Sequence, residues 1–278
     1  MSAVSVAPST PLPTATKVPF GRLVMVEWRK MTDTRAGRVM LMITGGLIAL
    51  VAGVILLVTA LSDMAALDAY NWMSALSFPV SLLVPVLAIM IVTQEWGQRT
   101  HMVTFTLEPS RLKVVFAKLV AVFVLGIVTM AVAVGVGALG TVIGGAIAGT
   151  DPNWNVTGEA LAWTLLTQIL YLLMGFGFAM LLLNTPAALV IYYGYTLILE
   201  ASVFSALYFV FDWAQSLFPW ISMQVAMMPF IAGDQMEAAG VAVEDGALGY
   251  ARLFTSIALW VGLPLVLGTM RVLKSELK

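Results

Sequence analysis

The sequence predicts an all-α, polytopic membrane protein with six transmembrane helices and further helical segments outside the bilayer. The chain of 278 residues is 60% hydrophobic and only 10% charged, and its mean hydropathy is +0.97. A soluble domain of this length needs more polar residues than that to cover its surface. Several uncharged stretches also reach the length of about 20 residues with which a helix crosses a bilayer.

The predicted spans follow from these uncharged stretches and from the residues that interrupt them. The stretch 160–199 contains Asn184, Thr185 and Pro186, a combination that ends one helix and starts another. It therefore counts as two spans. The expected spans are about 39–61, 72–94, 115–148, 160–183, 187–210 and 252–270. Glycines in the third span, at 140, 144, 145 and 149, allow close helix packing, either within the chain or between subunits.

The basic residues alternate between the two sides of this topology. Of the 14 Lys and Arg residues, six precede the first span, four lie between the second span and the foot of the third, and three follow the last. Arg252, at the mouth of the last span, is the exception. Loops on the other side carry acids instead. The positive-inside rule therefore predicts that both termini are cytoplasmic, and this charge pattern implies no nucleic-acid partner.

The chain is expected to form one domain, 20–278, behind a disordered cytoplasmic tail, 1–19, that is rich in Pro, Ser and Thr. Residues 20–36 have helical periodicity with one apolar face, which is typical of a helix lying in the membrane interface. Glu27 falls inside that apolar face. Its carboxylate either snorkels or pairs with Lys30, or it fixes this helix against the rest of the cytoplasmic face.

The segment 95–111, between the second and third spans, is too rich in charges and aromatic residues for a plain loop, and a proline ends it. We expect a short helix lying across the cytoplasmic face. The segment and the start of the next span carry, in this order, Glu95, Thr100, Leu107, Pro109, Ser110, Arg111 and Lys118. In these residues the sequence resembles the corresponding part of bacterial, actinobacterial-type permeases of type 2 ATP-binding cassette (ABC) transporters. The pattern departs at the turn, where Arg99 precedes Thr100 and Gly97 lies earlier.

The resemblance implies a permease subunit that forms the substrate pathway as a homodimer or heterodimer, works as an exporter and is driven by separate ABC ATPase subunits. It also implies that 95–111 is a coupling helix docking into the ATPase. The expected contact residues are Glu95, Arg99, Thr100, His101, Phe105, Pro109 and Arg111. ATP and Mg would bind the partner, because this chain has no phosphate-binding Gly-x-x-x-x-Gly-Lys-Ser/Thr motif. The alternative is a solvated basic loop anchored by Trp96 and Phe105.

Enzyme functions find little support in the sequence. His101 is the one histidine, so the chain offers no two-histidine zinc motif, and the absence of cysteine excludes thiolate metal sites and cysteine nucleophiles. No resident cofactor is expected. Because of its place in the predicted coupling helix, His101 is interpreted as a docking residue.

Glu200 is the single acid inside an otherwise apolar span, which makes it a candidate functional residue by default. A gating or structural role near the outer end of the pathway is expected, with Gln168 and Gln224 as weaker candidates. The insertion 212–250 is predicted to form short helices in the outer leaflet. There Trp220, Met223 and Met227 would share one face, which either lines a gate or packs on the last spans.

Two other classes of function stay open. In an ion-coupled secondary transporter or channel, Glu200 would be the titrating group. Such transporters are often built from inverted repeats, and the two halves of this sequence differ in their connectors. A non-transporting membrane scaffold or immunity protein is the third possibility.

Overall fold

The computed structural model describes residues 18–62, 65–98, 110–238 and 246–275, together with residues 100, 102 and 104. Within these residues the chain is helical, and six helices are long and apolar enough to cross a membrane. The predicted fold class is therefore confirmed. The spanning helices are α2 (Arg35–Leu61), α3 (Ala69–Gly97), α5 (Arg111–Ala148), α6 (Gly158–Leu182), the run Thr185–Val210 and the run Ala247–Lys274.

The last two spans each contain a π-helical turn. Thr185–Val210 consists of α7 (Thr185–Tyr193), η1 (Gly194–Phe204) and α8 (Ser205–Val210). Ala247–Lys274 consists of α11 (Ala247–Ile257), η2 (Ala258–Gly262) and α12 (Leu263–Lys274). Such turns are rare inside helices and often lie at functional sites.

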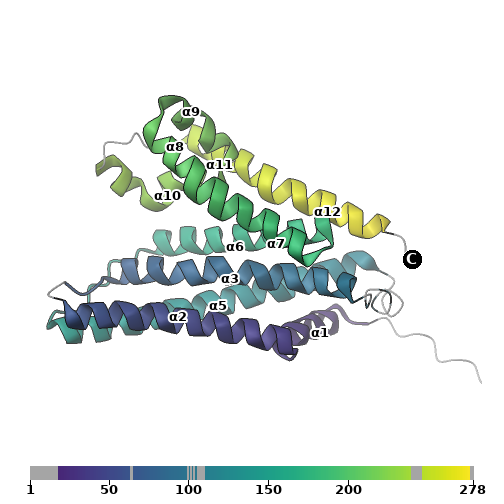
Figure 1. Cartoon of the computed structure of the whole chain (residues 1–278), viewed down its shortest axis with the longest axis horizontal. Helices are drawn as coiled ribbons and strands as arrows, with labels where there is room; N and C mark the ends of the chain where they lie inside the picture. Colours follow the sequence, from purple (N-terminus) through teal and green to yellow (C-terminus); the bar gives the residue numbers. More distant parts are fainter. Residues whose placement is uncertain are drawn as a thin grey trace, which may run out of the picture.

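The helices form two groups that diverge toward one end (Figure 1). Helices α2, α3 and α5 pack side by side, and α6 packs between α3 and α12. The run α7–η1–α8 contacts the last span where the Tyr195 ring of η1 stacks on the Trp260 ring of η2. We call the end that carries α1 (Phe20–Thr32) and the last residues of α12 the terminal end, and the opposite end the far end. The two groups separate at the far end, where α9 (Asp212–Ile221) and α10 (Met223–Ala238) lie.

Glycines set the closest helix approaches. In α5, a Cβ at Gly140 would lie 2.7 Å from three ring atoms of Trp72, whose indole is buried against this helix. In α6, Gly175 faces Pro85 of α3, and Gly177 faces Pro264 of α12. Gly140, Gly144 and Gly145 are all buried within the chain. The glycine face of the third span therefore serves packing inside one subunit, so the subunit-interface alternative is wrong for these three residues.

The N-terminal helix ends earlier than the sequence predicts. A single helix over 20–36 was expected, whereas α1 stops at Thr32 and α2 starts at Arg35. The reason is Thr34, which has extended backbone angles and accepts a hydrogen bond from the Gly37 N–H as the N-cap of α2. Thr157 and Asn184 cap α6 and α7 in the same way.

The insertion before the last span is also divided. Ser222 has extended backbone angles, φ −108° and ψ 122°, and separates α9 from α10. Trp220 therefore lies on a different helix from Met223 and Met227, and the expectation of one shared face is wrong. Three parts of the sequence lie outside the described residues: residues 239–245 of the insertion, residues 1–17 of the predicted tail, and residues 99, 101, 103 and 105–109 of the predicted coupling segment.

Candidate functional site

Four side chains of alternating charge meet where α1, α3 and α5 come together at the terminal end. Lys118 Nζ lies 2.7 Å from Glu27 Oε2 and 2.9 Å from Glu95 Oε1. Lys30 Nζ lies 2.6 Å from Glu27 Oε1 and 2.5 Å from Glu95 Oε1. We call these residues the charge quartet. Each carboxylate contacts both ammonium groups, so no member of the quartet is left unpaired.

Amphipathic α1 brings Glu27 into this position. The helix buries Met31 and Glu27 on one face, and Lys30 lies one turn along from Glu27. Both interpretations of Glu27 therefore apply: it pairs with Lys30, and it fixes α1 against the bundle through Lys118. Burial alone would lower the pKa of Lys30, but the charges of Glu27 and Glu95 outweigh this effect, and the pKa of Lys30 is raised above its usual 10.5.

The quartet ties three helices together at this end. Glu27, Glu95 and Lys118 are each less than a tenth exposed, and they come from three different helices. Removing one partner of a buried ion pair costs about 3–5 kcal/mol, because it leaves a charge in a medium that solvates it poorly. Sliding α1, α3 or α5 past the others would carry the same type of penalty.

The chain segment between α3 and α5 begins close to the quartet, because Glu95 lies in the last turn of α3. The Thr104 N–H donates to the Thr100 carbonyl, a helical bond inside the segment where a short helix was predicted. The other predicted docking residues here, Arg99, His101, Phe105 and Pro109, lie outside the described residues. We call residues 98–110 the connector. Both of its ends are set by long helices, α3 before it and α5 after it.

Arg111 takes a position that the sequence did not indicate. Its guanidinium lies 3.0, 3.1 and 2.6 Å from the carbonyl oxygens of Val272, Leu273 and Ser275. These carbonyls end α12, where a helix leaves acceptors without partners and where its dipole favours a cation. Arg111 thus ties the start of α5 to the end of the last helix, and contact with an ATPase remains a prediction for it.

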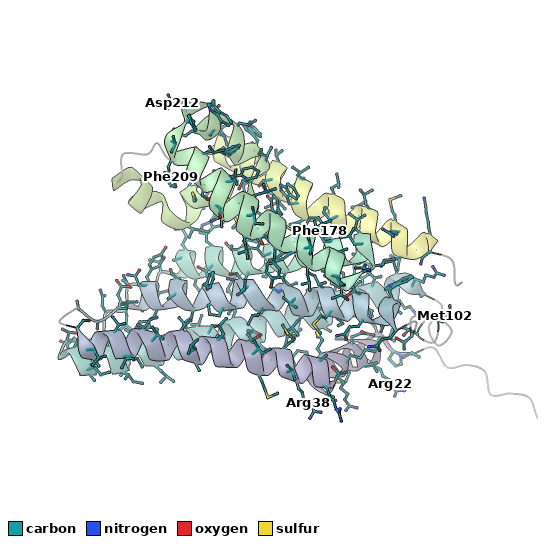
Figure 2. All side chains as sticks on the ribbon, viewed as in Figure 1. Arg22, Arg38, Met102, Phe178, Phe209 and Asp212 are labelled. Carbon is teal, nitrogen blue, oxygen red and sulfur yellow. The ribbon has the colours of Figure 1, made fainter. Side chains whose placement is uncertain are left out.

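A cavity of about 570 Å³ opens beside the quartet. Lys30, Glu95 and Thr100 line it together with apolar residues of α3. The exposed basic residues of α1 and α2, such as Arg22 and Arg38, lie at the same end, whereas acidic Asp212 lies at the far end (Figure 2). The charge separation read from the sequence is therefore present in the fold.

A second polar cluster surrounds Glu200, whose side chain is fully buried in η1. Its Oε1 accepts hydrogen bonds from the Tyr195 hydroxyl at 2.7 Å, the Gln224 N–H at 3.0 Å and the Ser222 hydroxyl at 3.1 Å. Its Oε2 accepts from the Tyr171 hydroxyl at 3.0 Å. One carboxylate thus links η1 to α6 and to the break between α9 and α10.

A second cavity, of about 390 Å³, lies between α3, α6, α7, η1 and α10. We call it the tyrosine cavity, because Tyr171, Tyr192 and Tyr193 line it. Gln168 and Met227, two of the predicted pathway residues, also line it. The other two predicted pathway residues of the insertion, Trp220 and Met223, do not line the cavity. Met223 is fully buried, and the Trp220 ring lies 6.0 Å from the Arg252 guanidinium.

The sequence matches the family described as ABC-2 family transporter protein over residues 23–199, more than half of the chain. The chain belongs to this family. This ABC-2 protein is accordingly a multi-pass membrane permease subunit, a type of subunit without its own ATPase site. Neither a curated protein nor a solved structure matches it.

The family match covers the charge quartet of this ABC-2 permease but does not reach Glu200. Residues 23–199 include the whole charge quartet, the connector and helices α3 and α6 of the tyrosine cavity. The match ends one residue before Glu200, and α9 to α12 follow it. The partners of Glu200, namely Tyr171, Tyr195 and Ser222, were missed by sequence reasoning. Tyrosines in an apolar span do not reveal which acid their hydroxyls reach.

Proposed function

We propose that this ABC-2 permease subunit works as a dimer in an ATP-driven exporter and is coupled to separate ATPase subunits through the connector. The observation that carries the proposal is the charge quartet at the root of the connector. A force applied to residues 98–110 acts directly on α3 and α5, and the quartet extends it to α1. Rigid-body movement of packed elements is one of the known ways in which a conformational change is transmitted through a protein.

The orientation that we propose places the terminal end in the cytoplasm. Basic residues gather at this end, and the positive-inside rule assigns such a face to the cytoplasm. ATPase subunits with bound ATP and Mg would then dock where the connector is exposed to them. The inner membrane of a bacterium is the compartment that fits this arrangement.

The substrate pathway that we propose runs along the tyrosine cavity. This cavity lies in the membrane-spanning region, where two groups of helices diverge toward the far end (Figure 1). Export is favoured because the type 2 permeases that the sequence resembles are predominantly exporters. Met227, Met228 and Phe78 give the cavity adaptable apolar walls.

Purification of the tagged protein in mild detergent tests the assembly. An ABC ATPase should co-purify in equal molar amount, and the particle mass should correspond to two permease and two ATPase subunits. A monodisperse permease without any ATPase, recovered from cells that express the neighbouring genes, would contradict the proposal.

A further inference from the structure

Most of the hydroxyls that line the tyrosine cavity present lone pairs rather than hydrogens to a ligand. Six lining hydroxyls use their hydrogen inside the protein: Ser77, Ser81, Thr167, Thr196 and Tyr193 donate to backbone carbonyls, and Tyr171 donates to Glu200. A carbonyl oxygen can only accept, so the direction of these bonds is fixed. The same hydroxyls are therefore left with lone pairs, which bind a ligand that carries donors.

The electrostatics point the same way. No charged side chain among the described residues lines the cavity, but the Glu200 carboxylate lies directly behind it, bonded to the lining residues Tyr171 and Gln224. Burial alone disfavours the ionised form of this carboxyl group, whereas the four donors that converge on it favour that form. In the described part of the chain, no Lys or Arg forms an ion pair with it. The cavity therefore lies next to a buried carboxyl group whose two oxygens accept four hydrogen bonds.

The rest of the cavity lining is aromatic and apolar. Tyr171, Tyr192, Tyr193 and Phe78 contribute rings to the lining, and the faces of such rings attract cations. Met227, Met228 and Ile231 supply an apolar wall. The volume of about 390 Å³ lies within the range of pockets that hold drug-sized molecules.

We propose that the tyrosine cavity binds amphiphilic organic ammonium ions, with the N–H donors on the lining hydroxyls and the apolar body against the methionine wall. This inference rests on the proposed function, in which the cavity belongs to the pathway, and it names the class of substrate. Glu200 supplies the charge preference from behind Tyr171. Neutral molecules of the same shape bind more weakly, and anions are rejected.

Three probes that share one aromatic body test this inference: 1-pyrenemethylamine, which is protonated at neutral pH, 1-pyrenemethanol and pyrene-1-sulfonate. Binding is measured by fluorescence with the purified protein in lipid nanodiscs, and the signal of empty nanodiscs is subtracted. The amine should bind about tenfold more tightly than the alcohol, and the sulfonate should not bind. Equal affinity for amine and alcohol, or preference for the sulfonate, would overturn the ligand class.

Two variants locate the effect. Glu200→Gln should bring the affinity for the amine close to that for the alcohol, whereas Glu159→Gln, an exposed acid at the far end of α6, should leave the ratio unchanged. Ser81→Trp should fill the cavity and abolish binding of both probes. If Ser81→Trp binds the amine like the wild type, the site lies elsewhere and the proposal fails. If Glu200→Gln does not fold, the proposal is still tested by Ser81→Trp and by the ratio of the amine and alcohol affinities in the wild type.

The assay contains no ATPase subunit. A failed binding result would therefore overturn the ligand assignment without touching the proposed function. Absence of a co-purifying ATPase would overturn the proposed function, whatever the probes do.

Discussion

The Lys118 ammonium of α5 lies 2.7 Å from the Glu27 carboxylate of α1, across 91 residues of sequence. Both side chains are buried, and each has a second partner of opposite charge in the quartet. This contact joins a helix outside the spans to the helix that follows the connector. It makes α1 part of the proposed moving unit.

We expect Glu27→Gln to lower the free energy of unfolding by about 3 kcal/mol, the low end for a broken buried ion pair, because Lys118 keeps Glu95 as a partner. In the double variant Glu27→Gln/Lys118→Gln, the loss of unfolding free energy should be smaller than the sum of the two single losses, by at least about 1 kcal/mol. Denaturant unfolding in detergent micelles measures both quantities. Glu159→Gln is the exposed control, and strict additivity would show that the two charges are not coupled.

The Lys30 pKa predicts a loss of stability at alkaline pH. Because the folded-state pKa is raised above the usual 10.5, the contribution of Lys30 is fully present below pH 10.5 and is lost as the pH rises through the higher folded value. The difference in unfolding temperature between the wild type and Lys30→Gln should therefore be constant up to about pH 10 and shrink above it. A difference that does not depend on pH would contradict the ion-pair interpretation.

Gly140→Ala tests the packing of α5 on Trp72. The added methyl group would lie 2.7 Å from the indole ring, so we expect a loss of about 1–3 kcal/mol from overpacking. Gly135→Ala on the same helix is the matched control, because its Cβ meets nothing within 4 Å. The control should be neutral or more stable by about 0.5–1 kcal/mol, since alanine favours helix. Equal effects of both variants would exclude a specific contact with Trp72.

Glu200 is predicted to have a structural role as well as its effect on ligand charge. Glu200→Leu leaves the Tyr195 and Ser222 hydroxyls and the Gln224 N–H without their acceptor, so stability should fall by about 3 kcal/mol or more. Glu200→Gln keeps an acceptor oxygen and should cost less. An ion-coupled carrier gives a different result: uphill transport would vanish in Glu200→Gln and would persist in wild-type vesicles depleted of ATP.

Most of the fold follows from the sequence because the membrane imposes simple rules. The span predicted at 72–94 is α3, Ala69–Gly97, and the one predicted at 187–210 is Thr185–Val210. Hydrophobic length and the Asn184 cap were sufficient for these assignments. Local signals also identified Glu27 as unusual, since a carboxylate on an apolar helix face needs a partner.

The remaining features depend on contacts between distant segments, and the periodicity of the sequence does not reveal such contacts. Lys118 fits the family pattern, but its pairing with Glu27 and Glu95 appears only when three helices are packed. The division of the insertion at Ser222 was missed for a similar reason: its hydroxyl bonds to Glu200, 22 residues away. Arg111 was interpreted as a docking residue, and its bonds to the end of α12 depend on the path of the last helix.

The most direct test of the central claim is ATP hydrolysis and transport by the purified assembly carrying Arg99→Glu and Phe105→Ala. This double variant reverses one charge and removes one aromatic ring in the connector, where we propose that the ATPase subunit docks. Several kcal/mol of binding free energy could be lost if both side chains are buried there. We predict loss of the co-purifying ATPase and of ATP-dependent transport, while the permease stays folded in detergent. An intact assembly with undiminished transport would contradict coupling through the connector.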